Sequence, residues 1–237
     1  MGLFTRRKSD AVDEGVEAVA QDAAEDADDA AQPDQPRRGP HDVADVPDLE
    51  ARLDLGALRI PARPGMQVRL EVEKRTNNIV AVTLGLTGSA MQLQVFAAPR
   101  TQGIWDELRE EISGSIAKQG GTVDQIDGPF GTELLARLPV KVADGQISHR
   151  AARFVGIDGP RWFLRAVLTG KSAVEQEAAA ELEAVLADVV VVRGAEARAP
   201  RDVLLLHAPG KPQAPQQSGA EPDLDITRRG PEITEVR

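Results

Sequence analysis

Residues 154–165, FVGIDGPRWFLR, place three of the chain's seven aromatic side chains within ten residues. Apolar residues flank the turn-forming residues Asp158, Gly159 and Pro160, so the stretch predicts a β-hairpin. Because Pro160 has no N–H group to close a two-residue turn, we expect a four-residue loop, Ile157–Pro160.

This loop sets the predicted pairing of the hairpin. Val155 then lies opposite Trp162, and Phe154 lies opposite Phe163. Alternation along the strands assigns Trp162, Leu164, Ala166 and Leu168 to an apolar face that also carries Val155. The other face carries the two phenylalanines among arginines.

Strand-like patterns continue on both sides of the hairpin. The predicted strands are Met66–Lys74, Ile79–Leu86, Ala90–Ala97, Thr122–Ile126, Thr132–Val140, Gln146–Val155, Arg161–Leu168 and Val189–Arg193. Apolar residues spaced three or four apart predict helices at about 102–118 and 173–187. We therefore expect an α+β fold with a mostly antiparallel sheet, two helices that cover one face, and two similar β-β-β-α-β halves.

The acidity of the chain lies in its N-terminal part. The net charge is −10 overall, but residues 1–50 contain 14 acidic and 5 basic residues, whereas residues 51–207 contain 19 of each. Residues 1–49 combine acidic residues with small apolar ones, and residues 208–237 are rich in Pro and Gln. Both predict disordered tails around a single domain, 50–207.

The composition excludes several classes of protein. The chain has no cysteine, which excludes disulfides and thiolate sites, and it has no apolar run of about 18 residues that predicts a membrane span. We expect a cytoplasmic protein that is not bound to a membrane.

One phosphate-binding motif is incomplete. Thr169-Gly170-Lys171-Ser172 matches the end of a P-loop, but the position that needs the first glycine is Arg165. We expect instead that Ser172 and Glu175 form a capping box at the start of the second helix.

No arrangement of residues predicts a catalytic or metal site. His41, His149 and His207 are far apart in the sequence and lack ligand spacing. An enzyme would need residues that meet only in the fold, such as His149 with Ser148 and Asp158. We expect no catalytic residue, metal or cofactor.

The remaining candidate binding residues lie on the arginine-containing face of the hairpin: Arg150, Phe154, Arg161, Phe163 and Arg165. Two interpretations stay open. Arginines beside aromatic rings bind phosphates and stack on bases. Alternatively, the arginine stems cover the rings and their charges pair with carboxylates of the sheet.

Four segments resemble an actinobacterial family of uncharacterised proteins that is classed as a domain of unknown function. They are AAPRTQGIWDELREEI (97–112), DGPFGTELLARLPV (127–140), RFVGIDGPRWFLRAVLTG (153–170) and VVVVRG (189–194). The resemblance implies a cytoplasmic actinobacterial protein, and it assigns no reaction, ligand or site residue.

The sequence therefore favours a non-enzymatic interaction or accessory module with a protein partner. The alternative is a protein that binds nucleic acid or a phosphorylated ligand through the basic and aromatic sheet face, although no nucleic-acid-binding motif is present.

Overall fold

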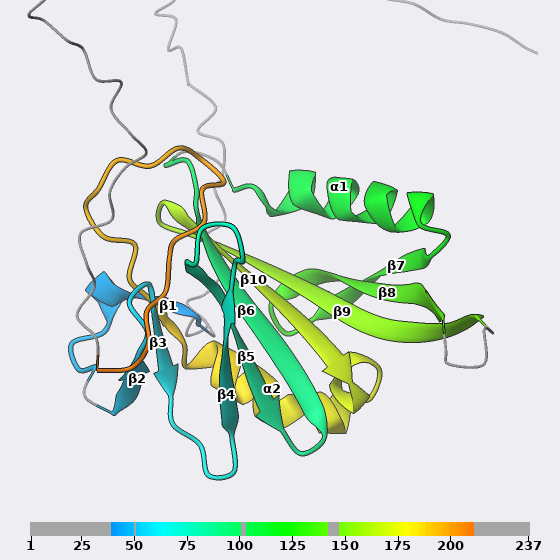
Figure 1. Ribbon diagram of the computed structural model, residues 1–237, viewed down its shortest axis with the longest axis horizontal. Helices are drawn as coiled ribbons and strands as arrows, with labels where there is room; N and C mark the ends of the chain where they lie inside the picture. The colour runs from blue at the N-terminus through cyan, green and yellow to red at the C-terminus, as the bar shows by residue number, and fades with distance from the viewer. Residues whose placement is uncertain (1–38, 50, 101–102, 142–146, 211–237) are drawn as a thin grey trace, which may run out of the picture. The chain divides into compact units, whose positions relative to one another are not determined.

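The computed structural model describes residues 39–49, 51–100, 103–141 and 147–210 (Figure 1). The predicted tails, 1–49 and 208–237, lie outside these residues apart from 39–49 and 208–210. His41–Asp42 forms a short strand, β1, so the folded part of the chain begins before residue 50.

Seven antiparallel strands form the larger sheet. Their order is β4-β5-β6-β10-β9-β8-β7 (Figure 1). β10, from the hairpin that contains residues 154–165, is therefore the central strand, and β9 lies next to it. The bounds are β4 (Gln67–Val72), β5 (Ile79–Leu86), β6 (Ser89–Ala97), β7 (Thr122–Gly128), β8 (Gly131–Lys141), β9 (Ile147–Gly159) and β10 (Trp162–Gly170). These strands confirm seven of the eight predicted ones.

A small mixed sheet contains the shortest strands. Its order is β1-β11-β3-β2, with β2 (Arg52–Asp54), β3 (Leu58–Pro61) and β11 (Val190–Val191). β1 pairs with β11 in parallel, and the other pairs are antiparallel. The predicted strand Val189–Arg193 thus belongs to this sheet. β1, β2 and β3 have two to four residues each, too few to produce a readable alternation.

The two helices lie on opposite faces of the larger sheet. Helix α2 (Gln176–Ala187) packs its Leu182, Val185 and Leu186 with the β10 residues Leu164, Ala166 and Leu168. Helix α1 (Trp105–Lys118) packs with Phe163 and Leu134, whose side chains point to the other face. The expectation that both helices cover one face was wrong. The face that carries Phe163 is apolar as well, and the apolar stripe of α1 packs against it.

Short 3-10 helices complete the described elements. They are η1 (Val43–Asp45) and η2 (Lys171–Ala173). No helix in the described part of the chain is long and apolar enough to cross a membrane.

The β9–β10 hairpin has a tighter turn than we expected. Trp162 pairs with Gly159 and Phe163 pairs with Asp158, so only Pro160 and Arg161 lie between the strands. The four-residue loop was therefore wrong. Arg161 adopts a φ of 62°, which suits the second central position of a type II turn, and Pro160 suits the first.

The corrected pairing leaves the predicted faces unchanged. Val155 lies opposite Ala166 and Phe154 lies opposite Val167, so the register shifts by an even number of residues. Trp162 is 1% exposed on the α2 face, where its Nε1 donates a hydrogen bond to Asp42 Oδ2 over 2.7 Å. The predicted core position of Trp162 is confirmed.

Candidate functional site

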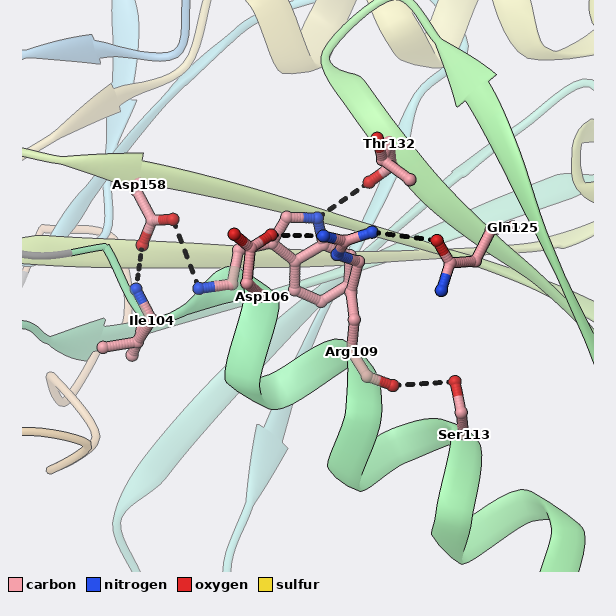
Figure 2. A network of polar contacts seen from close by, with 8 residues as sticks. Ile104, Asp106, Arg109, Ser113, Gln125, Thr132 and Asp158 are labelled. Atoms are coloured by element: carbon pink, nitrogen blue, oxygen red, sulfur yellow. Dashed lines mark hydrogen bonds and ion pairs between the residues drawn. The ribbon is translucent and has the colours of Figure 1, made fainter.

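The start of helix α1 is held by a carboxylate from strand β9. Asp158 Oδ1 accepts a hydrogen bond from the Ile104 N–H over 2.8 Å, and Oδ2 accepts one from the Trp105 N–H over 3.2 Å (Figure 2). The first N–H groups of a helix have no partner within the helix, and its N-terminus favours negative charge. Asp158 therefore caps α1 from a neighbouring strand.

Trp105 fixes the same end of the helix against the sheet. Its Nε1 donates to the Thr132 carbonyl over 2.8 Å, and its ring stacks on Phe163 with the centroids 5.9 Å apart. A Cβ on Gly156 would lie 2.1 Å from the Trp105 ring. Glycine at this position of β9 thus makes room for the indole.

Polar contacts fasten α1 on the side of strand β7. Arg109 Nη1 donates to Gln125 Oε1 over 3.2 Å, and Nη2 pairs with Asp106 on the preceding turn (Figure 2). Ser113 Oγ donates to the Arg109 carbonyl over 2.7 Å.

An arginine from the C-terminal segment fastens the opposite side of α1. Arg201 Nη2 lies 2.8 Å from Glu107 Oε2, and Nη1 lies 3.0 Å from Glu111 Oε1. The Arg201 N–H donates to the Ala97 carbonyl at the end of β6 over 2.7 Å. Glu107 and Glu111, two acidic residues of the same helix, therefore share a cation from another part of the chain.

A cleft lies between α1 and the sheet, beside Arg201. Its volume is about 250 Å³. Apolar side chains make up most of its wall, and the polar side chains are few. The apolar lining residues are Phe96, Ile104, Leu108, Ile112 and Phe163, and the polar ones are Glu111, Ser115, Arg165 and Arg201. We refer to this space as the α1 cleft.

Arg165 is the distinctive polar residue of the α1 cleft. Its Nη2 donates to Gln94 Oε1 over 2.5 Å, and its guanidinium carbon lies 5.7 Å from the centre of the Phe96 ring. Its Nε is buried and donates no hydrogen bond within the described residues. Burial lowers the pKa of Arg165 from its usual value. The residue is thus a half-buried cation that has a neutral partner.

The five candidate residues from the sequence do not form one site. Phe163 and Arg165 line the α1 cleft. Phe154 packs against the same aromatic cluster without lining the cleft. Arg161 lies in the hairpin turn, where its carbonyl accepts the Ala98 N–H over 2.9 Å, and Arg150 is exposed nearer the other end of β9.

The basic and aromatic sheet face is also not open. The Phe163 side chain is 0% exposed, because Trp105 and the apolar side of α1 cover it. Sequence reasoning identified the helix and its stripe but did not place the helix on this face. Two positions determine this placement. The sequence predicts Asp158 only as a turn residue, and it gives no signal for Gly156.

Two other depressions formed by described residues suit a ligand less well. A groove of about 420 Å³ beside α2 is lined mainly by small or acidic side chains, including Ala180, Glu183 and Ala184. A depression of about 570 Å³ around His149 and Arg150 is formed largely by exposed residues.

The conceivable catalytic trio is not assembled. Asp158 lies nine residues from His149 on the same strand, about 30 Å away at the usual rise of a β-strand. Among the residues that the structure describes, no group of three or more His, Asp or Glu side chains is placed to hold a metal ion.

The expected capping box at helix α2 was wrong. Ser172 lies in η2, where its Oγ donates to the Thr169 carbonyl over 3.1 Å, and α2 begins three residues beyond Ala173. The Ser172 N–H donates to Ser89 Oγ over 3.1 Å. The polar groups of this segment thus connect β10 to β6 and do not cap the helix.

A buried charge cluster joins β8, β9 and α2. Arg153 Nε lies 3.4 Å from Glu133 Oε2, and its Nη2 pairs with Glu183. Glu133 is 1% exposed. Burial raises the pKa of Glu133 to about 7; the charge of Arg153 acts against this, and Glu183 adds to it.

The comparisons with known proteins show the family. Residues 39–215 match the model of a family described as "Protein of unknown function (DUF3710)", and the chain belongs to that family. No curated protein matches the chain. The solution structure of cyanobacterial PsbP (CyanoP) from Synechocystis sp. PCC 6803 is similar at a TM-score of 0.33 and 13% identity; the match covers 60% of this chain and 94% of that one.

The first prediction concerns the cap on α1. Replacing Asp158 with Ala removes the acceptor of two N–H groups, so we expect the free energy of unfolding to fall by about 1 kcal/mol. Hydrogen exchange should speed up first in α1. Asp127→Ala, at an exposed position of β7, is the matched control. Unchanged exchange in α1 of the Asp158 variant would contradict this role.

The second prediction concerns pH. A carboxyl whose pKa is higher in the folded state stabilises the fold below its unfolded pKa and loses this contribution as pH rises through the folded value. With a folded pKa of about 7 for Glu133, wild-type stability should fall by about 3 kcal/mol between roughly pH 4.5 and 7 through this residue.

Chemical denaturation at a series of pH values measures this contribution. Glu133→Gln should flatten the decline, whereas Glu110→Gln, at an exposed position of α1, should keep the wild-type slope. Parallel slopes for wild type and Glu133→Gln would show that this carboxyl does not titrate near neutral pH.

Proposed function

We propose that the protein is a non-enzymatic binding module that holds a small apolar ligand in the α1 cleft. The observation that supports this most is the cleft itself, an apolar space of about 250 Å³ between a helix and a sheet. Protein interiors are close-packed and contain few voids larger than a water molecule. This volume is that of about eight water molecules in the liquid.

The fastening of α1 adds to this interpretation. The helix is held at its start by Asp158, on one side by Gln125 and on the other by Arg201. A preformed cleft binds without paying the entropy of assembling its own walls. Its volume is just below the usual range of small-molecule pockets, about 300–1,000 Å³, which suits a ligand of few atoms.

The polar groups of the cleft suit binding more than catalysis. Glu111 is paired with Arg201, and Ser115 Oγ accepts a hydrogen bond from Gln119 Nε2 over 3.3 Å. The described residues that line the cleft include no histidine to act as a base for Ser115.

Binding of nucleic acid has less support. Stacking of bases needs open aromatic rings, and Phe163 has no exposed surface. A protein partner, which we expected for an accessory module, remains a prediction, and the acidic segment 1–38 lies outside the described residues.

Three further expectations also remain predictions. They are the cytoplasmic location, the actinobacterial origin and the division into two similar halves. The order of elements from β4 to β11 reads β-β-β-α-β twice once η2 is set aside, which favours the halves. The placement of α1 and α2 on opposite faces does not favour them.

The third prediction tests the cleft by filling it. Ile112→Trp adds an indole to the wall of the α1 cleft, so binding of 1-hexanol, a neutral apolar probe, should weaken at least tenfold. Perturbation of methyl chemical shifts on titration measures the affinity, which we expect in the millimolar range for so small a probe. Val174→Trp, at a residue that is 61% exposed, is the matched control.

Leu108→Phe fills the cleft with a smaller change and serves where Ile112→Trp disturbs the fold. Circular dichroism and thermal unfolding report on the fold of both. Hexanol affinity that stays at the wild-type value in both folded variants would rule out the α1 cleft as the binding site.

A further inference from the structure

We propose that the ligand of the α1 cleft is a small monocarboxylate with about six to eight carbons in all, whose head group pairs with Arg165. This inference rests on the proposed function and adds the charge, the head group and the residue that recognises it.

The charge balance around the cleft is the first argument. Arg201 at the mouth already faces two carboxylates, Glu107 and Glu111. Within the described residues, no carboxylate forms an ion pair with Arg165, whose bonded partner is the neutral amide of Gln94. Arg165 is therefore the cation of the cleft that lacks a counter-charge.

Two other arginines of the larger sheet and its helices, the buried Arg153 and the half-buried Arg109, have carboxylate partners. Arg153 is paired with Glu133 and Glu183, and Arg109 is paired with Asp106. Burial of a charge is costly unless the charge is paired and hydrogen-bonded. Within the described residues, Arg165 is bonded only to the neutral Gln94 amide and so differs from both of these arginines.

The position of Arg165 in the cleft is the second argument. Arg165 lies opposite Gln94 on neighbouring strands, and Phe96 and Phe163 are the next residues along the same face. A carboxylate beside the guanidinium places its attached carbons along the partly exposed Phe96 ring and the apolar side of α1. Cation and apolar wall thus match the two parts of an amphipathic acid.

The number of charges and the volume narrow the ligand class. A phosphate dianion would need a second free cation, and Arg201 is taken up by its two carboxylates. A space of about 250 Å³ holds about eight to ten non-hydrogen atoms, if each fills nearly the volume of a water molecule. Hexanoate has eight such atoms and octanoate has ten.

Gln94 is the residue that the ligand would displace. A hydrogen bond between an ionised donor and an ionised acceptor is shorter and about twice as strong as one between neutral groups. A carboxylate therefore competes well with the amide oxygen for Arg165 Nη2. Once displaced, the Gln94 amide remains in reach as a second donor for the bound carboxylate.

The experiment compares three probes of equal chain length: hexanoate, 1-hexanol and hexylamine. Titrations followed by methyl chemical shifts at low salt should show hexanoate binding at least tenfold more tightly than hexanol, and hexylamine binding most weakly. Raising the salt concentration should reduce the preference for hexanoate. The acid should also bind more tightly than the alcohol when octanoate is compared with octanol. With a twelve-carbon acid and the twelve-carbon alcohol this preference should disappear, because both chains exceed the cleft.

Arg165→Gln should remove the preference for hexanoate and leave hexanol affinity within about twofold. Arg150→Gln, an exposed arginine outside the α1 cleft, is the matched control and should keep the preference. Gln94→Glu is a second variant that retains Arg165. It sets a carboxylate of the chain against the guanidinium, so it should weaken hexanoate at least tenfold and spare hexanol.

The outcomes separate this inference from the proposed function. Hexanol that binds in the cleft as tightly as hexanoate, or a hexanoate preference that survives both Arg165→Gln and Gln94→Glu, overturns the carboxylate assignment and leaves the binding module standing. If neither probe binds the wild-type protein at millimolar concentration, both proposals are wrong.

Discussion

The hydrogen bonds from Asp158 to the start of α1 fix the position of this helix on the larger sheet, and the α1 cleft depends on that position. The carboxylate holds the Ile104 and Trp105 N–H groups at the end of β9, and Trp105 then rests on Gly156 and Phe163. A helix of 14 residues is about 21 Å long, so fixing its first turn sets the path of the remainder. The α1 cleft lies along that path, and Leu108, Ile112 and Ser115 of the helix line it.

The two faces of the larger sheet differ in how completely side chains pack on them. The α2 face is a continuous apolar core that includes Trp162, and its charges are gathered in the cluster of Glu133, Arg153 and Glu183. The α1 face leaves a space beside Arg165. Close packing is the default for protein interiors, so the incomplete face is where a ligand is expected. The same molecule thus contains a paired buried arginine for structure and one without a carboxylate beside an open cleft.

Much of the fold could be predicted from periodicity, but the site could not. The alternation of residues 162–168 predicted the correct core face even though the turn was misplaced, because an even register shift leaves side-chain directions unchanged. The apolar stripe of Trp105, Leu108 and Ile112 predicted a helix that packs against the rest of the domain. Periodicity does not indicate which face of the sheet the helix packs against. Asp158 and Gly156 acquire their roles only when a helix from a distant part of the chain packs on them. The sequence therefore predicted the face with the candidate binding residues but not the helix α1 that packs on it.

The most direct test of a ligand site under α1 is to locate a bound probe by intermolecular nuclear Overhauser effects. With hexanoate in exchange on the wild-type protein, the account predicts cross-peaks from its methyl protons to the methyl groups of Ile104, Leu108 and Ile112, three residues that line the cleft. Cross-peaks to Ala180 and Ala184 in the groove beside α2, with none to the α1 methyl groups, would contradict it.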